Sequence, residues 1–120
     1  MVDVAVIGAG QTKYGNHPLG LKAMWAEAAA KAFDSVDNNF EAKLVDEAFI
    51  GSVAFGGAQL GNTAAILTEH SGMKGCSVRR VENACASSGF ALRDAMMAIK
   101  SGEADIVVAA TGFNMNVLGD

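Results

Sequence analysis

Residues 78–101 read VRRVENACASSGFALRDAMMAIKS, and this stretch passes directly from a strand pattern to a helix pattern. Val78 to Asn83 predicts a strand, and Ala86 to Ser101 predicts a helix with Gly102 beyond its end. Small or apolar side chains lie on nearly every side of that helix. Because a helix that is apolar all round is buried all round, we expect a central helix that is covered on both sides.

Elements of the same two kinds alternate through the rest of the chain. The β-branched run from Val2 to Ile7 predicts a strand buried on both faces. Further out, the patterns predict a helix from Leu21 to Val36, a strand from Ala48 to Phe55, a helix from Asn62 to His70 that Asn62 caps and Gly72 stops, and a strand from Asp105 to Thr111. Strict alternation predicts an α/β fold with a mainly parallel sheet and right-handed crossovers.

The predicted central helix needs more protein around it than this chain supplies. A chain of 120 residues, 51% of them hydrophobic, corresponds to roughly one domain with a core of its own. Such a unit is too small to cover the helix completely, so we infer missing partners: the rest of a longer chain, a second subunit, or both. The sequence also stops at residues 117–120, just past a strand and loop, which predicts truncation.

Composition and charge exclude several classes of function. The 13 acidic and 9 basic residues are spread thinly and give a formal charge of −4, so the sequence predicts no binding to nucleic acid or to an anionic membrane. No basic signal-peptide start and no apolar run of about 20 residues is present. We expect a cytoplasmic protein with thiols rather than disulfides, and the two cysteines, with no histidine cluster nearby, predict no metal site.

Cys85 is the candidate nucleophile, because it lies where the predicted strand meets the predicted helix. The positive end of a helix dipole favours a thiolate, and an exposed backbone N–H at such a sharp turn can bind an oxyanion. Small neighbours on both sides would let a substrate approach. The alternative reading is that Cys85 is a small core residue, as most buried free cysteines are.

Three segments of the chain resemble thiolases, in particular the sterol-carrier-protein type found in archaea and bacteria. The segment Val81 to Leu92 (VENACASSGFAL) is similar to the one that carries the nucleophilic cysteine of that family. Ile7 to Gly15 (IGAGQTKYG) and Ile99 to Ala110 (IKSGEADIVVAA) agree with it, in the right order. The cysteine segment is shared in outline with ketoacyl synthases and hydroxymethylglutaryl-CoA synthase.

The resemblance implies a layered α/β/α/β/α sandwich of two similar halves, of which only the first βαβαβαβ portion is present. Residues 1–120 would then be the N-terminal part of a thiolase N-terminal domain. It implies a coenzyme A thioester as substrate, an acyl group carried on Cys85, no covalently bound cofactor, and Claisen condensation or thiolytic cleavage of a 3-ketoacyl-CoA. It also implies a homodimer or tetramer, in some members with a small acyl-CoA-binding partner that contains an OB-fold and a zinc ribbon.

Parts of the family pattern are missing from this chain. The histidine that activates the cysteine, the second cysteine and the further oxyanion-hole groups lie far downstream in thiolases. His17 and His70 match none of these motifs, and we interpret them as a loop residue and a last-turn helix residue. Cys76 matches no catalytic position and is interpreted as structural, although a disulfide with Cys85, which would block the nucleophile, stays open. The run from Gly112 to Met115 stands where the family usually has an acidic residue.

Two other functions stay open. The chain could be a non-catalytic scaffold or split-subunit fragment that only completes a thiolase-like assembly. It could also be a dinucleotide-binding domain, because Gly8, Gly10 and Gly15 follow a predicted strand. The fingerprint G-x-G-x-x-G is broken, however, since Lys13 occupies the position of its third glycine.

Overall fold

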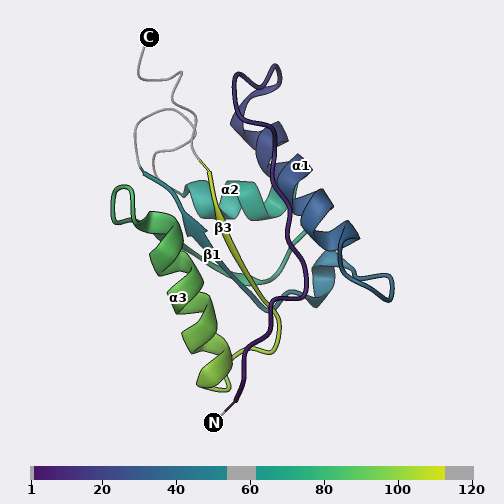
Figure 1. Cartoon of the computed structure of the whole chain (residues 1–120), viewed down its shortest axis with the longest axis vertical. Helices are drawn as coiled ribbons and strands as arrows, with labels where there is room; N and C mark the ends of the chain where they lie inside the picture. Colours follow the sequence, from purple (N-terminus) through teal and green to yellow (C-terminus); the bar gives the residue numbers. More distant parts are fainter. Residues whose placement is uncertain (1, 54–61, 113–120) are drawn as a thin grey trace.

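Three parallel strands with helices on both faces make up this protein, in a computed structural model that describes residues 2–53 and 62–112. The elements are α1 (Gly20–Asp34), the 3-10 helix η1 (Ala42–Leu44), β1 (Glu47–Gly51), α2 (Thr63–His70), β2 (Ser77–Val81), α3 (Ser87–Lys100) and β3 (Val107–Thr111) (Figure 1). The strand order is β2-β1-β3, and both pairings of β1 are parallel. The predicted α/β fold with a parallel sheet is confirmed.

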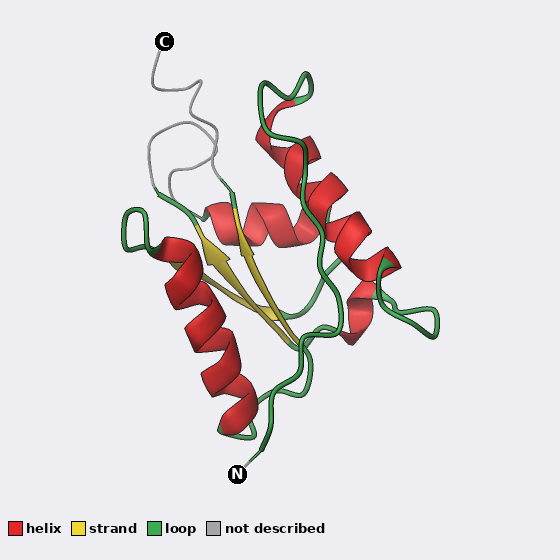
Figure 2. Ribbon diagram, viewed as in Figure 1, coloured by secondary structure: helices red, strands yellow, loops and turns green. Residues whose placement is uncertain are grey.

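The central strand β1 is buried along its whole length because helices cover both of its faces. Ala48 and Ile50 face the side of α1 and α2, whereas Phe49 faces α3, as the period of two in a strand requires. Figure 2 shows the resulting three layers, with α3 on one face of the sheet and α1 and α2 on the other. These α/β/α layers form part of the layered arrangement predicted from the sequence.

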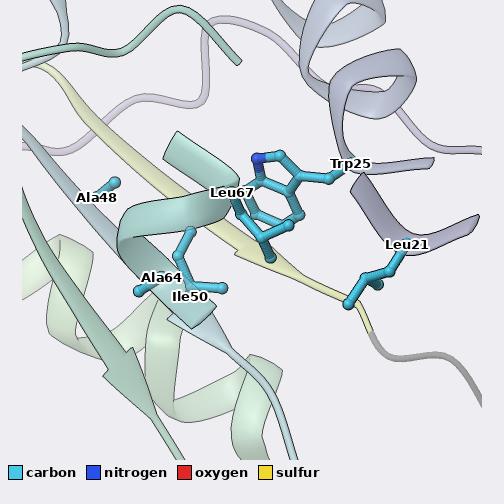
Figure 3. Close-up of a cluster of buried hydrophobic side chains, with 6 residues drawn as sticks. All are labelled: Leu21, Trp25, Ala48, Ile50, Ala64 and Leu67. Carbon is cyan, nitrogen blue, oxygen red and sulfur yellow. The ribbon is translucent and has the colours of Figure 1, made fainter. Parts of the chain in front are cut away.

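Two apolar clusters hold the layers together. The larger one joins α1, α2 and β1 and consists of Leu21, Trp25, Ala48, Ile50, Ala64 and Leu67 (Figure 3). The smaller one joins Phe49 of β1 to Ala91 and Ala95 of α3. Because the side chains of Ala91 and Ala95 are small, the axis of α3 lies close to the sheet.

The predicted ends of the helices are observed at particular residues. The Asn62 side chain accepts a hydrogen bond from Ala65 N at 3.4 Å and caps α2. Gly72, with φ of +79°, ends that helix. Asn38 and Asn39 take up left-handed backbone conformations after α1, which asparagine tolerates better than most residues do.

The prediction of a strand from Val2 to Ile7 is wrong. This segment is extended loop, and Val6 is 83% exposed. No described strand offers it a ladder of hydrogen bonds, and the glycines that follow hold the chain against α1 instead. A Cβ atom on Gly10 would lie 2.4 Å from Ala28 O and Ala32 N, so only glycine lets the loop approach the helix this closely (Figure 1).

The strand boundaries also differ by a few residues from those predicted. β1 ends at Gly51, and the predicted end at Phe55 lies outside the described residues. β2 ends at Val81 rather than at Asn83, because the chain already turns toward α3 there.

Within this chain, α3 is covered on one side, and its coverage on the other side by further protein stays a prediction. Its buried residues are Ser87, Ala91 and Ala95, which form one stripe against the sheet. Phe90, Leu92, Met96 and Met97 are between 38% and 51% exposed. The sheet can reach only one side of the helix, so the outer side is the surface that further protein was expected to cover.

Candidate active site

Cys85 lies in the sharp turn that joins β2 to α3, and it is exposed rather than buried in the core. Ala84, directly before it, has φ of +45°, a left-handed conformation that is uncommon for a residue with a side chain. Such backbone strain, of about 1–3 kcal/mol, is maintained only where the surroundings impose it, and it clusters at active sites. The alternative interpretation of Cys85 as a buried core residue therefore does not hold in this structure.

The turn before Cys85 is held by the buried hydroxyl of Ser87. Asn83 N donates to Ser87 Oγ at 2.8 Å, and Ser87 Oγ donates to Ala84 O at 2.7 Å. The Glu82 carboxylate accepts a hydrogen bond from Ala84 N at 2.8 Å. These bonds fix both peptide groups of Ala84, so they impose the conformation that presents Cys85.

Gly51 brings the start of α3 against the carboxyl end of β1. A Cβ atom at position 51 would lie 2.9 Å from backbone atoms of Ser87 and Ser88, so a side chain there would push the helix away. The Thr111 hydroxyl donates to Gly51 O at 2.9 Å and ties the end of β3 to the same point. The ends of parallel strands are where α/β proteins usually bind ligands.

A cavity of about 180 Å³ opens at this junction of strand ends and helix start. Its wall is formed by Ser52, Val53, Ala84, Cys85, Ser87, Ser88 and Thr111. A second, more open hollow of about 390 Å³ lies along the outer side of α3 and is lined by Cys85, Ala86, Ser88, Gly89, Phe90 and Arg93. Cys85 lines both hollows, so its thiol can be reached from two directions.

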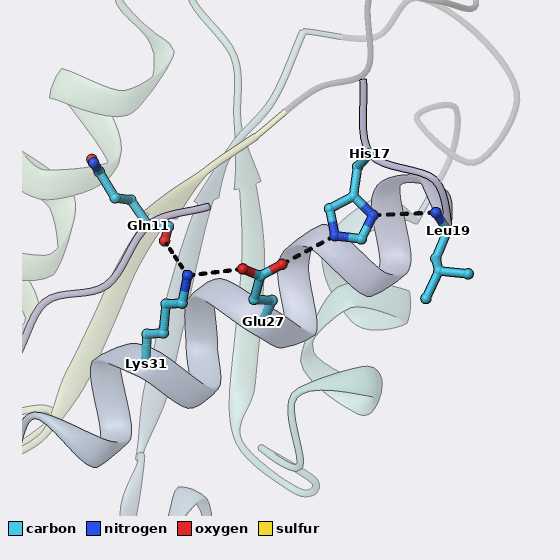
Figure 4. A network of polar contacts seen from close by, with 5 residues as sticks. All are labelled: Gln11, His17, Leu19, Glu27 and Lys31. Carbon is cyan, nitrogen blue, oxygen red and sulfur yellow. Dashed lines mark hydrogen bonds and ion pairs between the residues drawn. The ribbon is translucent and has the colours of Figure 1, made fainter. Parts of the chain in front are cut away.

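Neither of the two histidines, His17 and His70, lines this cavity. His17 Nδ1 accepts from Leu19 N at 3.2 Å, so its Nε2 carries the hydrogen and donates to Glu27 at 3.0 Å (Figure 4). Lys31 donates to the other oxygen of Glu27 at 2.8 Å. The hydrogen bond from Lys31 and, to a smaller extent, the one from His17 lower the pKa of the Glu27 carboxyl. His70 donates from Nδ1 to Ile66 O at 2.8 Å. Both histidines thus have local structural partners, as expected.

Cys76 differs from Cys85 in its surroundings. It is half-buried against the larger apolar cluster, and this burial raises the pKa of its thiol. Both cysteines are free thiols in the structure, so the disulfide left open by the sequence is not formed.

The described residues contain no group of three or more His, Cys, Asp or Glu side chains placed to hold a metal ion. In this part of the chain, no helix combines the length and the apolar character needed to cross a bilayer. The strand, turn and helix required by a dinucleotide fingerprint are not formed either, because Gly8 and Gly10 lie in a loop packed along α1.

Sequence reasoning missed Ser52, Ser87 and Thr111 as parts of the candidate site. A signal for two of them was present, since Ser52 and Thr111 each stand at the carboxyl end of an apolar strand. The carboxyl ends of parallel strands lie at one edge of a sheet, so polar residues at these ends are expected to meet. Nothing in the sequence pattern marks Ser87 as the residue that binds back to the turn.

Comparisons with known proteins agree with this architecture. Residues 4–116 match the family model described as thiolase, N-terminal domain. An acetyl-CoA acetyltransferase of Methanocaldococcus jannaschii is 36% identical over an alignment of 112 positions, and the match covers 90% of this chain and 28% of that protein. An acetyl-CoA acetyltransferase of Methanothermobacter thermautotrophicus is 38% identical, over 92% of this chain and 29% of that protein.

A solved structure shares the fold. The 3-oxoacyl-[acyl-carrier-protein] synthase III of Aquifex aeolicus superposes with a TM-score of 0.61 at 24% identity. The match covers 73% of this chain and 28% of that one. The chain therefore spans less than a third of the length of the proteins that it matches.

Proposed function

Since this chain belongs to the thiolase family, through its N-terminal domain, we propose that Cys85 accepts an acyl group from a coenzyme A thioester. The observation that carries the proposal is the placement of Cys85, exposed at the start of α3 and in the wall of a cavity. A thiol that served only to fill the core would be buried there instead. The two relatives named acetyl-CoA acetyltransferase support acetyl as the first group to test.

The proposed step is an exchange between two sulfur atoms. The thiolate of Cys85 attacks the carbonyl carbon of the thioester and forms a new carbon–sulfur bond, while the bond to the coenzyme A sulfur breaks. Coenzyme A leaves as a thiolate and takes up the proton that Cys85 gave away. Because the attacking and leaving thiols have similar pKa values, one difficult transfer becomes two easier ones.

The remaining machinery is proposed to lie on further protein. Residues 1–120 would be the first part of a thiolase N-terminal domain, since the chain spans only 28% and 29% of the two relatives. Neither described histidine lines the cavity, so the base that takes the thiol proton would come from that further protein. A second thioester would then undergo Claisen condensation with the acyl group on Cys85. In the reverse direction, cleavage of a 3-ketoacyl-CoA would place the acyl group on Cys85.

Intact mass of the complete enzyme after brief exposure to acetyl-CoA tests the proposal. We expect a gain of one acetyl group that is lost in Cys85→Ala and kept in Cys76→Ala, which removes the other thiol of this chain. A gain that persists in Cys85→Ala would assign the acyl group to another residue. No gain with acetyl-CoA or other short acyl-CoAs, in a folded enzyme, would contradict the proposed step.

A non-catalytic role in completing an assembly is the second candidate. It is favoured by the outer side of α3, because the apolar side chains there are exposed in this chain: Phe90, Leu92, Met96 and Met97. The two candidates differ in what alkylation of Cys85 does to the assembled enzyme. Loss of acetyl transfer after complete alkylation of Cys85 supports catalysis by this chain, and full activity supports the assembly role.

A further inference from the structure

We propose that the hydroxyl group of Ser52 donates a hydrogen bond to the carbonyl oxygen of the acyl group that reaches Cys85. This inference rests on the proposed function and adds to it a second residue that touches the reacting atoms. It also assigns the cavity of about 180 Å³ to the acyl group rather than to the body of coenzyme A.

Ser52 stands directly after β1, at the end of the strand that lies under α3. Its backbone N donates to Val81 O at 3.2 Å, which fixes the residue beside the start of the turn that carries Cys85. Ser52 and Cys85 contribute to the wall of the same cavity. Ser52 is 0% exposed, so its hydroxyl has no contact with bulk water.

The hydroxyl of Ser52 has no hydrogen-bond partner among the described residues. Burying a hydroxyl without a partner is unfavourable, and native proteins keep such groups only rarely. The indole nitrogen of Trp25 shares this property, but Trp25 lies in the apolar cluster between α1 and the sheet. Ser52 differs because the residue belongs to the wall of the cavity that Cys85 also lines.

The other hydroxyl groups of the cavity wall are differently placed. Thr111 donates to Gly51 O, and Ser87 donates to Ala84 O while it accepts from Asn83 N. Ser88 is exposed and open to water. Among the buried hydroxyls of this wall, the one of Ser52 therefore remains able to donate a hydrogen bond to a ligand.

The size and lining of the cavity indicate which part of a thioester it takes. Pockets that hold drug-sized ligands measure roughly 300–1,000 Å³, so a cavity of about 180 Å³ suits a short acyl group. Val53 and Ala84 supply apolar wall for its alkyl part, and Ser52 supplies a donor for its oxygen. When the thiolate attacks, this oxygen gains negative charge, and a hydrogen bond from a pre-positioned donor then strengthens.

The test compares Ser52→Ala with the wild-type complete enzyme in the rate of Cys85 acetylation by acetyl-CoA. Loss of one such donor costs on the order of 100-fold in comparable sites, and we expect at least about a 10-fold slower acetylation at saturating acetyl-CoA. Ser101→Ala, which removes an exposed hydroxyl at the far end of α3 and outside the cavity wall, is the control and should acetylate at close to the wild-type rate.

A thermal melt of the same variants separates this role from a structural one. Because the Ser52 hydroxyl has no hydrogen-bond partner in the described part of the chain, Ser52→Ala should melt no lower than wild type while it acetylates more slowly. A lower melting temperature with an acetylation rate equal to that of wild type would overturn the inference. If wild type itself is not acetylated, the proposed function fails; if wild type and Ser52→Ala are acetylated equally fast, only the role of Ser52 fails.

Discussion

The Ser87 hydroxyl donates a 2.7 Å hydrogen bond to the carbonyl oxygen of Ala84, the residue directly before Cys85. It also accepts a 2.8 Å bond from Asn83 N, so a single side chain on the first turn of α3 closes the turn that precedes it. Ser87 is 3% exposed, and water cannot readily replace either bond. The position of the candidate nucleophile therefore depends on a hydroxyl that is already engaged in two hydrogen bonds to the turn.

Ser87→Ala should lower both stability and acetylation of Cys85. The substitution leaves one backbone donor and one acceptor without their partner, which we expect to reduce the free energy of unfolding by about 1–3 kcal/mol. Denaturant unfolding and intact mass after acetyl-CoA treatment measure the two effects. Ser101→Ala is the control, since the Ser101 hydroxyl bonds Ala98 O at the exposed far end of the same helix; an equal loss in both variants would contradict the role given to Ser87.

Gly51→Ala should destabilise the protein by about 1–3 kcal/mol, because the added Cβ would lie 2.9 Å from backbone atoms of Ser87 and Ser88. The neighbouring atoms belong to a helix and cannot give way as a flexible side chain would. Gly89→Ala is the opposite control, since nothing lies within 4 Å of its added Cβ and alanine favours a helix by about 1 kcal/mol over glycine. Chemical denaturation of both variants should show shifts of opposite sign, and a neutral Gly51→Ala would argue against close packing of α3 on β1.

The order of the α-helices and strands from α1 to β3 could be predicted from the sequence because each of them carries its own local signal; the short helix η1 was not predicted. Asn62 and Gly72 bound α2, and Gly102, with φ of +82°, follows α3. The period of the apolar residues then identifies each segment as strand or helix. Such signals lie within a few residues of the element that they describe.

The errors concern features that depend on distant neighbours. A strand needs a partner for its backbone groups, and Val2 to Ile7 has a strand composition but no described strand beside it. The coverage of the outer side of α3 also depends on distant neighbours: within this chain the sheet covers one side only, and further protein is expected on the other. In the candidate site, the local setting singles out Cys85 as a candidate, whereas the signal for Ser52 is only its position at the carboxyl end of a strand. The cavity that brings these two residues together is visible only in the structure.

Asp46 should make stability depend on pH. Its carboxylate accepts hydrogen bonds of 3.0 Å from Asp105 N and Ile106 N, just before β3, and these bonds lower its pKa below the ordinary value of 3.8. A lowered pKa in the folded state contributes stability above the unfolded pKa, and that contribution is lost as the pH falls through the folded value.

Asp46→Asn should therefore be less stable than wild type at about pH 6, and this difference should shrink as the pH falls below 3.8. Urea unfolding over this pH range measures it. Asp37→Asn, at an exposed carboxylate without a hydrogen bond in the described part of the chain, should show a smaller dependence. A difference that grows toward low pH would have the wrong sign for the bonds seen here.

Cys85 should be alkylated by iodoacetamide before Cys76. The thiolate is the reactive form, and burial raises the pKa of Cys76 above its ordinary value of 9.0, so less of that thiol is ionised at about pH 8. Cys76 is also half-buried against the apolar cluster, whereas Cys85 is exposed and lines two hollows.

Peptide mass spectrometry after timed alkylation measures the two rates, and raising the pH should accelerate the reaction of Cys76. The variant Cys76→Ala should leave the rate at Cys85 unchanged, because the two thiols belong to different parts of the fold. If Cys76 reacted first, the turn before α3 would not present Cys85 as described. The order of alkylation therefore tests the accessibility of the proposed nucleophile without any acyl donor.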